Sequence, residues 1–199
     1  MNQTNKPARE KWNFLLVLGL LGLVLFLGLL LAASQQQAAT AAPAGAQSAD
    51  GLWQDMDETT LRLTGDRAIV PTAYRTVSLD WSKLNGLLAA APEGADQMAA
   101  SDVVLSLPLP DGGYGRFQIS QTAVMHPELA AKFPEIKTYA GVGLDDPTAY
   151  ARLDTTPHGF HAMILSVNGR VFIDPYSRDG IDLYQSYFAR DFVPDLPAD

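Results

Sequence analysis

The sequence predicts an α+β domain, mainly antiparallel β-sheet with two short helices, preceded by a single N-terminal transmembrane helix or signal sequence. Three observations lead to this fold class: a long apolar run near the N-terminus, an Asn-Gly pair between two apolar segments, and helix-start residues before two short runs. Of the 199 residues, 47% are hydrophobic and 18% are charged, so the chain is too apolar to be intrinsically disordered.

The apolar run covers residues 14–33 and contains no charged side chain. A helix of this length spans roughly 30 Å, the thickness of a bilayer core. Lys6, Arg9 and Lys11 precede the run and no basic residue follows until Arg62, so residues 1–13 are expected in the cytoplasm and the domain outside the membrane. The run is longer than the apolar core of about 7–15 residues in a cleaved signal peptide, which favours a permanent anchor. If the signal is cleaved, the domain is secreted.

Residues 34–50 are rich in alanine and glutamine, with almost no charge and no large apolar side chain. Such a segment buries too little apolar surface to offset its ordering entropy, so we expect a flexible linker. The exported folded domain is expected over residues 51–199, which is long enough for one domain with its own core.

The strongest local signal is a β-hairpin in which residues 160–167 and 170–173 flank Asn168-Gly169. This pair is favoured by a type I′ turn. Four apolar residues of the two arms are expected to be buried: Phe160, Ile164, Phe172 and Ile173.

A second hairpin is expected from residues 105–109 and 114–120 around the turn at 110–113. Pro108 has no backbone N–H to donate, so its strand is expected at a sheet edge. Further short strands are expected at residues 61–63, 73–78, 136–139, 149–154 and 181–187.

Two short helices fit between these strands. Asp80 is expected to cap a helix that ends near Pro92, because an aspartate oxygen can accept from free N–H groups of the first turn. Pro127 suits the first position of a second helix, which Pro134 is expected to end.

Charge and composition exclude several function classes. Twenty-two acidic against fourteen Lys and Arg residues give a net charge of −8, and nucleic acid needs a basic face that such a chain lacks. The absence of cysteine excludes a disulfide framework and a thiol nucleophile. No HExxH, GxSxG or phosphate-binding loop is present, and Gly141-Val-Gly143 lacks the third glycine of a dinucleotide site, which indicates a loop. We expect neither enzyme activity nor a small-molecule cofactor.

His158 and His161 are three residues apart and are expected on one strand. Side chains at an odd separation on a strand point to opposite faces, so the pair predicts no metal site. His161 is expected to be a strand residue whose ring is hydrogen-bonded by a neighbour.

The acidic pairs favour turns over metal sites. Asp145-Asp146-Pro147 lacks further oxygen ligands at short spacing and is interpreted as a turn and not a calcium site. Asp174 follows an apolar strand, and three arginines are possible partners for its carboxylate: Arg152, Arg170 and Arg178.

Four segments resemble a known family in their order and spacing: LPLPDGGYGRFQI (107–119), residues 124–164, VFIDPY (171–176) and YQSYFARDF (184–192). They are similar to the N-terminal propeptide region of bacterial secreted reprolysin-like zinc metalloproteases. The resemblance implies a prodomain that helps a zinc protease domain to fold and covers its cleft. The HExxH-bearing domain of such precursors is not among these residues, so no catalytic residue carries over. Without cysteine, a propeptide thiolate cannot block the zinc.

The expected function is therefore that of a membrane-tethered, non-catalytic, propeptide-like domain that binds, inhibits or assists folding of an exported zinc metalloprotease. Two alternatives remain: an envelope interaction or adhesion module of the same fold, and a remnant of a precursor without its catalytic domain. The expected contact surface is an exposed Gly- and Asp-rich loop with two residues from a later strand: Tyr139, Gly141, Gly143, Asp145, Asp146, Asp174 and Tyr176. The glycines equally suit tight turns.

Overall fold

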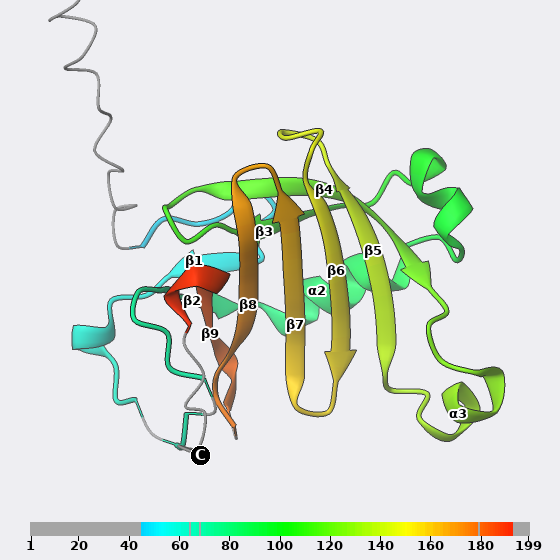
Figure 1. Ribbon diagram of the computed structural model, residues 1–199. Coiled ribbons are helices and arrows are strands. Elements are labelled where there is room, and N and C mark those ends of the chain that lie inside the picture. Colours follow the sequence, from blue (N-terminus) through cyan, green and yellow to red (C-terminus); the bar gives the residue numbers. More distant parts are fainter. Residues whose placement is uncertain (1–44, 64, 68, 179, 193–199) are drawn as a thin grey trace, which may run out of the picture. The chain divides into compact units, whose positions relative to one another are not determined.

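The computed structural model describes residues 45–63, 65–67, 69–178 and 180–192 (Figure 1). All described residues belong to one compact unit of the chain. The expected anchor at residues 14–33 lies outside the described residues. Among the described residues, no helix is both long and apolar enough to cross a bilayer.

The described residues form one nine-stranded antiparallel sheet with the strand order β1-β2-β9-β8-β7-β6-β5-β4-β3. Strands β3 to β9 are neighbours in chain order, and the N-terminal pair β1–β2 is added beside β9. The strands are β1 (Trp53–Asp55), β2 (Arg75–Leu79), β3 (Val104–Pro108), β4 (Tyr114–Thr122), β5 (Lys137–Gly143), β6 (Tyr150–Thr156), β7 (Gly159–Ser166), β8 (Gly169–Ser177) and β9 (Gly180–Phe188). The predicted architecture of mainly antiparallel sheet with two short helices is confirmed.

The two helices begin where their capping residues predict. In α2 (Trp81–Ala89), the N-cap Asp80 accepts a hydrogen bond from the Lys83 N–H at 3.1 Å. In α3 (Pro127–Lys132), the proline occupies the first turn. Short 3₁₀ turns complete the described helical segments: η1 (Glu58–Thr60), η2 (Ala95–Ala100) and η3 (Ala189–Asp191).

Helix α2 packs its apolar side against the core. Leu84 and Leu88 are buried in the main cluster of the sheet interior. The Trp81 Nε1–H donates to the Ile181 carbonyl at the start of β9 at 2.6 Å. After the helix, the Pro92 carbonyl accepts from a backbone N–H near the end of β4. The α2 segment therefore runs from β9 to β4 across one end of the sheet.

Side chains join the two edges of the sheet. The Trp53 Nε1–H of β1 donates to the Ser106 carbonyl of β3 at 2.7 Å, and the Asp50 carboxylate accepts from the Ser106 N–H at 2.7 Å. Nearby, the Ser186 hydroxyl of β9 donates to the Pro108 carbonyl at 2.8 Å. The sheet is thus a nearly closed barrel, and its seam satisfies backbone groups that an edge strand would otherwise leave open. Pro108 lies in an edge strand, as predicted.

The core lies inside the curved sheet, and strand alternation decides which residues enter it. Phe160, Ile164 and Ile173 are buried as predicted, but Phe172 is only half-buried. Its neighbours along β8 point inward, so Phe172 points to the outer face, where its ring packs 5.7 Å from that of Tyr187. The prediction that Phe172 is a core residue is wrong for this reason.

The central hairpin is confirmed, but its turn is not of type I′. Ser166 pairs with Gly169, which leaves Val167 and Asn168 as the turn residues. A type I′ turn needs positive φ at both turn residues, and no described non-glycine residue has a positive φ. Gly169, with φ +120°, supplies the left-handed conformation one residue later, as a bulge glycine does.

Two further expectations need correction. Residues 45–50, assigned to the linker, are packed against the sheet: the Ala46 carbonyl accepts from the Asp55 N–H at 2.8 Å, and Ser48 is buried. The folded part therefore begins before Gly51. Residues 61–63 form no strand, and β1 was not predicted because three residues are too few to show alternation.

We predict that Ile173→Ala lowers the free energy of unfolding by about 2–5 kcal/mol, because it opens a cavity in the core. Phe172→Ala should cost less, since its ring leaves a half-exposed outer site. Urea unfolding of the full chain in mild detergent, followed by tryptophan fluorescence, measures both variants. A larger loss for Phe172→Ala would contradict the inward assignment of Ile173.

Candidate functional site

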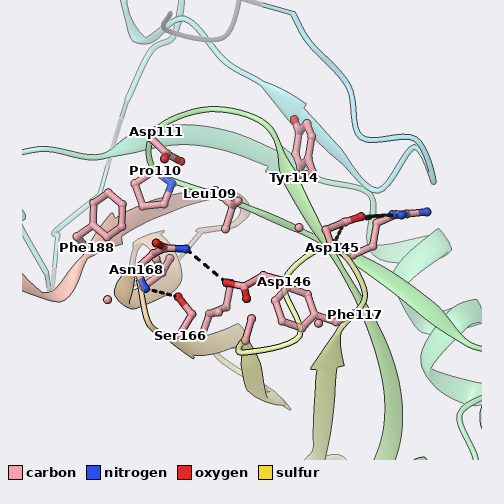
Figure 2. A pocket seen from close by; sticks show the side chains of 17 residues that line it. Leu109, Pro110, Asp111, Tyr114, Phe117, Asp145, Asp146, Ser166, Asn168 and Phe188 are labelled. Atoms are coloured by element: carbon pink, nitrogen blue, oxygen red, sulfur yellow. Dashed lines mark hydrogen bonds and ion pairs between the residues drawn. The ribbon is translucent and has the colours of Figure 1, made fainter. Parts of the chain in front are cut away.

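A cavity of about 230 Å³ opens where the β3–β4, β5–β6 and β7–β8 turns meet at one end of the barrel (Figure 2). We call it the mouth cavity. Its lining comprises Leu109, Pro110, Asp111, Tyr114, Gly115, Arg116, Phe117, Gly143, Asp145, Asp146, Ala149, Ile164, Ser166, Asn168, Gly169, Val171 and Phe188. Three hairpin turns, each close in sequence to its own strands, therefore build one site.

The inner walls of the mouth cavity are apolar. Phe117, Ile164 and Val171 are inward-facing strand residues and are almost fully buried. Gly143 allows the β5–β6 turn beside this wall to fold tightly, because a Cβ there would lie 2.3 Å from the Asp146 carbonyl oxygen and 3.0 Å from the Ala149 Cβ. A side chain at Gly143 would force this turn open.

The rim of the mouth cavity is polar and acidic. Asp146 accepts hydrogen bonds at Oδ1 from the Thr148 N–H at 2.9 Å and from its hydroxyl at 2.6 Å. These bonds hold the pKa of the Asp146 carboxyl below its usual value, so the group is ionised at neutral pH. Its second oxygen accepts from the Asn168 amide at 3.4 Å across the rim (Figure 2). Asp146 thus carries a fixed negative charge at the opening.

Asp145 is held by an exposed ion pair. Its Oδ1 lies 2.6 Å from Nη2 of Arg116, and its Oδ2 accepts from the Arg116 backbone N–H at 2.9 Å. The Arg116 side chain lowers the pKa of the Asp145 carboxyl, mainly through this side-chain hydrogen bond. Within the described residues, Asp111 and Asp146 make no comparable ion pair. The unneutralised charge of the rim therefore resides on Asp111 and Asp146.

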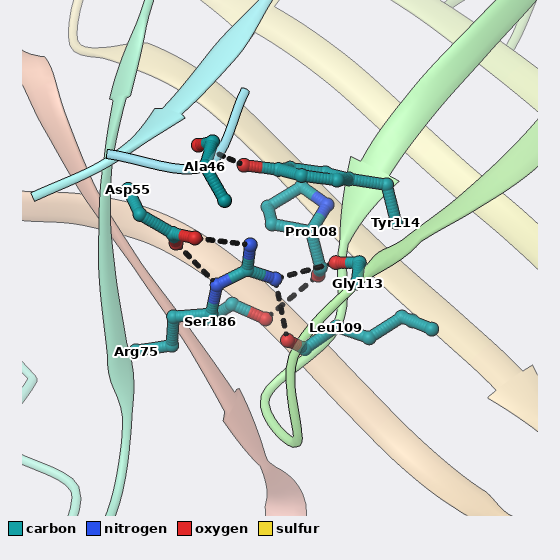
Figure 3. Close-up of polar contacts among 8 residues, drawn as sticks. All are labelled: Ala46, Asp55, Arg75, Pro108, Leu109, Gly113, Tyr114 and Ser186. Carbon is teal, nitrogen blue, oxygen red and sulfur yellow. Dashed lines mark hydrogen bonds and ion pairs between the residues drawn. The ribbon is translucent and has the colours of Figure 1, made fainter. Parts of the chain in front are cut away.

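Arg75 fixes the β3–β4 turn that borders the mouth cavity (Figure 3). Its guanidinium pairs with Asp55, with Nε 2.5 Å from Oδ1, and the two side chains are only 9% and 7% exposed. The same guanidinium donates to the carbonyls of Leu109 at 2.9 Å and Gly113 at 2.5 Å. It also lies 4.5 Å from the centre of the Tyr114 ring. One buried cation therefore ties β1 and β2 to the turn.

Tyr114 links the β3–β4 turn to the segment that precedes β1. Burial raises its pKa to about 12, so the phenol stays protonated and donates to the Ala46 carbonyl at 3.2 Å. The seam near the mouth cavity is consequently closed by neutral and paired groups.

The predicted contact residues divide between separate places. Gly143, Asp145 and Asp146 lie at the mouth cavity. Tyr139 and Gly141 do not form an exposed loop: they are buried in strand β5, and Tyr139 is 4% exposed. Gly141 is needed for packing, since a Cβ there would lie 3.1 Å from a methyl group of Ile119. The loop expected at residues 141–143 is therefore wrong.

Asp174 and Tyr176 lie on β8, away from the mouth cavity. Tyr176 is 7% exposed, and its ring and that of Tyr74 contact the Arg67 guanidinium at 4.3 and 4.6 Å from their centres. Arg67 also donates to the Gln185 amide oxygen at 2.6 Å. This cluster fastens the β1–β2 connection to the sheet, so Tyr176 is unavailable to a partner.

A second pocket, here called the outer pocket, contains Asp174. Its described lining is Ile69, His158, His161, Asp174, Pro175, Ser177 and Arg178. Asp174 accepts from the Tyr187 hydroxyl at 2.7 Å, and burial raises the pKa of its carboxyl. None of the three arginines considered as possible partners pairs with Asp174 in the described ion pairs.

The two histidines both line the outer pocket. His158 lies in the β6–β7 turn and not on the strand, so the expectation that they face opposite sides is wrong. His161 is on β7 and its Nδ1 lies 3.1 Å from Asp154 Oδ1. This hydrogen bond raises the pKa of His161. Among the described residues, no group of three or more His, Cys, Asp or Glu is placed to hold a metal.

Sequence reasoning found the rim of the mouth cavity but missed its walls. Inward strand positions near turns were the available signal, and three of them are Phe117, Ile164 and Val171. Apolar walls below a charged rim suit the binding of a ligand or a partner side chain. Comparison with protein-family models, curated proteins and solved structures found no match.

We predict that Arg75→Leu lowers the free energy of unfolding by about 3–5 kcal/mol, because it leaves the buried Asp55 carboxylate without its partner. Arg116→Leu is the matched control, since its pair with Asp145 is 57% and 43% exposed and should contribute much less. Urea unfolding compares the two variants. Equal losses would contradict the role assigned to Arg75.

We predict that His161 stabilises the fold more at low than at high pH. Its folded-state pKa is raised above the ordinary value of about 6.5, so its contribution is complete below that value and is lost as pH rises through the raised pKa. The stability difference between the wild type and His161→Gln should therefore shrink with rising pH. Burial raises the pKa of Asp174 as well, and the charge of His161 lowers it, so His161→Gln also changes the titration of Asp174.

Asp154→Asn is the control for the His161 prediction, because it removes the main cause of the raised pKa. Titration of the His161 ring by NMR should show a lower pKa in this variant. A wild-type pKa at or below about 6.5 would contradict the prediction.

Proposed function

We propose that the chain is a membrane-tethered, non-catalytic, propeptide-like domain that binds an exported zinc metalloprotease and inhibits it or assists its folding. One observation supports this most directly: the four segments that resemble reprolysin-like propeptides all contribute to the mouth cavity. Residues 107–119 give the β3–β4 side, 124–164 the β5–β6 turn and one wall, 171–176 give Val171, and 184–192 give Phe188.

The location of the mouth cavity supports a binding role. Turns at one end of a rigid sheet are positioned by the strands and remain free to contact other molecules. The cavity has apolar walls inside a charged rim, an arrangement typical of interaction sites. The domain therefore offers a partner a preformed surface that need not be ordered on binding.

The rim favours charge recognition over zinc coordination. Both oxygens of Asp145 already accept hydrogen bonds from Arg116. Oδ1 of Asp146 accepts twice from Thr148. A rim with ionised carboxylates accelerates and orients association with a positively charged partner surface. We therefore assign the rim to docking.

The proposed membrane tether rests on sequence alone. Residues 14–33 are apolar and follow three basic residues, so the N-terminus is proposed to be cytoplasmic and the domain exported. In this arrangement the anchor would concentrate the domain where exported proteases emerge and fold.

We predict that the full chain, in detergent, slows peptide hydrolysis by a reprolysin-like zinc protease of the same genome or raises its refolding yield. The double variant Asp145→Ala/Asp146→Ala should weaken the effect several-fold, because it removes rim charges that guide docking. Initial hydrolysis rates and recovered activity after refolding are the measurements.

Asp182→Ala is the matched control for the docking experiment, because Asp182 lies near the start of β9 whereas Phe188 at its end lines the mouth cavity. This variant should behave as the wild type. If the chain affects no such protease but binds cells or surface polymers, the adhesion function replaces the one proposed.

A further inference from the structure

The size of the mouth cavity limits what can enter it. Its volume of about 230 Å³ is below the range of roughly 300–1,000 Å³ typical of pockets for drug-sized ligands. An engineered apolar cavity of about 150 Å³ in another protein holds one benzene molecule. The mouth cavity therefore has room for a single aromatic or large aliphatic side chain.

The chemistry of the walls selects an apolar group. Phe117, Ile164 and Val171 form the inner surface, and all three are 5% exposed or less. Inserting an uncompensated charged group against this surface would cost its desolvation free energy, so a charge cannot occupy the interior. An apolar ring placed there gains about 25 cal/mol for each Å² of surface removed from water.

The chemistry of the rim selects a positive charge beside that apolar group. Asp111 and Asp146 line the opening without an ion pair among the described residues, and Asp145 is neutralised by Arg116. One further cation is near: the Arg190 guanidinium lies 3.9 Å from the centre of the Phe188 ring. Three carboxylates therefore face two guanidinium groups around the opening.

We infer that the mouth cavity binds an extended segment of a protein partner through one large apolar side chain, with an adjacent Lys or Arg at the Asp111 and Asp146 carboxylates. This inference rests on the proposed function and names the chemical contact that it would use. The apolar side chain fills the cavity as an anchor, and the basic group stays at the rim in partial contact with water. Tight binding therefore requires both the apolar side chain in the cavity and the basic group at the rim.

The test uses 2-phenylethylammonium as the probe, because it joins one aromatic ring to one positive charge. The full chain in zwitterionic detergent is titrated, and NMR follows the methyl groups of Ile164 and Val171. We expect saturable shifts at both residues. The neutral analogue 2-phenylethanol should bind about tenfold more weakly, since it loses the interaction with the rim.

Variants separate the cavity from the rim. Asp111→Asn/Asp146→Asn should weaken binding of the charged probe about tenfold and leave binding of the neutral analogue unchanged. Val171→Phe should abolish binding of both by filling the cavity. Asp182→Asn is the matched charge control and should bind as the wild type. Partition of the probes into detergent is the same for every variant and cancels in the comparison. If Val171→Phe does not fold, the Asp111→Asn/Asp146→Asn variant decides the outcome.

Equal binding of the two probes to the wild type, or absence of shifts at Ile164 and Val171, overturns the inference. The protease experiment fails independently of this one. If the charged probe does not bind but the chain still inhibits the protease, the inference is wrong and the proposed function stands. If the probe binds as expected but no protease is affected, the cavity retains this ligand chemistry and the proposed function is wrong.

Discussion

The buried ion pair between Arg75 and Asp55 is the contact on which the rest of the structure depends. An open sheet of nine strands has two edges whose backbone groups need partners. Arg75 reaches from β2 to the carbonyls of the β3–β4 turn and is itself neutralised by Asp55 of β1. Two charges are stable in this position because each satisfies the other and the remaining donors find carbonyl oxygens. Trp53 and Asp50 extend the same seam along β3.

Closure of the seam also explains where the proposed binding site lies. Once the sheet curves, inward side chains of neighbouring strands converge, and those near the turns line the mouth cavity. Helix α2 spans one end of the sheet through Trp81 and the residues around Pro92. The mouth cavity, in contrast, is surrounded by hairpin turns, which can carry charges without disturbing the core. The contacts that stabilise the fold and the proposed binding site thus lie in different parts of one sheet.

The contribution of each charged group to stability, and the direction of its pKa shift, depend on how far it is buried. The Arg75–Asp55 pair is shielded from water, so loss of either partner is costly, whereas the Arg116–Asp145 pair is exposed and mainly orients the rim. The charged groups of the outer pocket lie between these two cases in burial. There, Asp154 raises the pKa of His161, and burial raises that of Asp174. In the proposed propeptide-like role, the exposed charges and not the buried ones would contact a partner.

Sequence alone determined the features that depend on residues close together in the chain. Both hairpins, the Asp80 cap, the helix start at Pro127 and the edge position of Pro108 follow from hydrogen bonds and steric limits within a few residues. Only the tertiary structure decided the seam, the apolar walls of the mouth cavity and the separation of Asp174 from Asp146.

These tertiary contacts join distant segments: Trp53 and Ser106 are 53 residues apart, and Arg67 and Gln185 are 118 apart. Such pairs leave no periodic signal, because nothing between them constrains the chain to bring them together. Even the glycines of β5, which resemble a loop in sequence, are explained by side chains such as Ile119 from the neighbouring strand. Only the curvature of the sheet brings the residues of the seam and of the mouth cavity together.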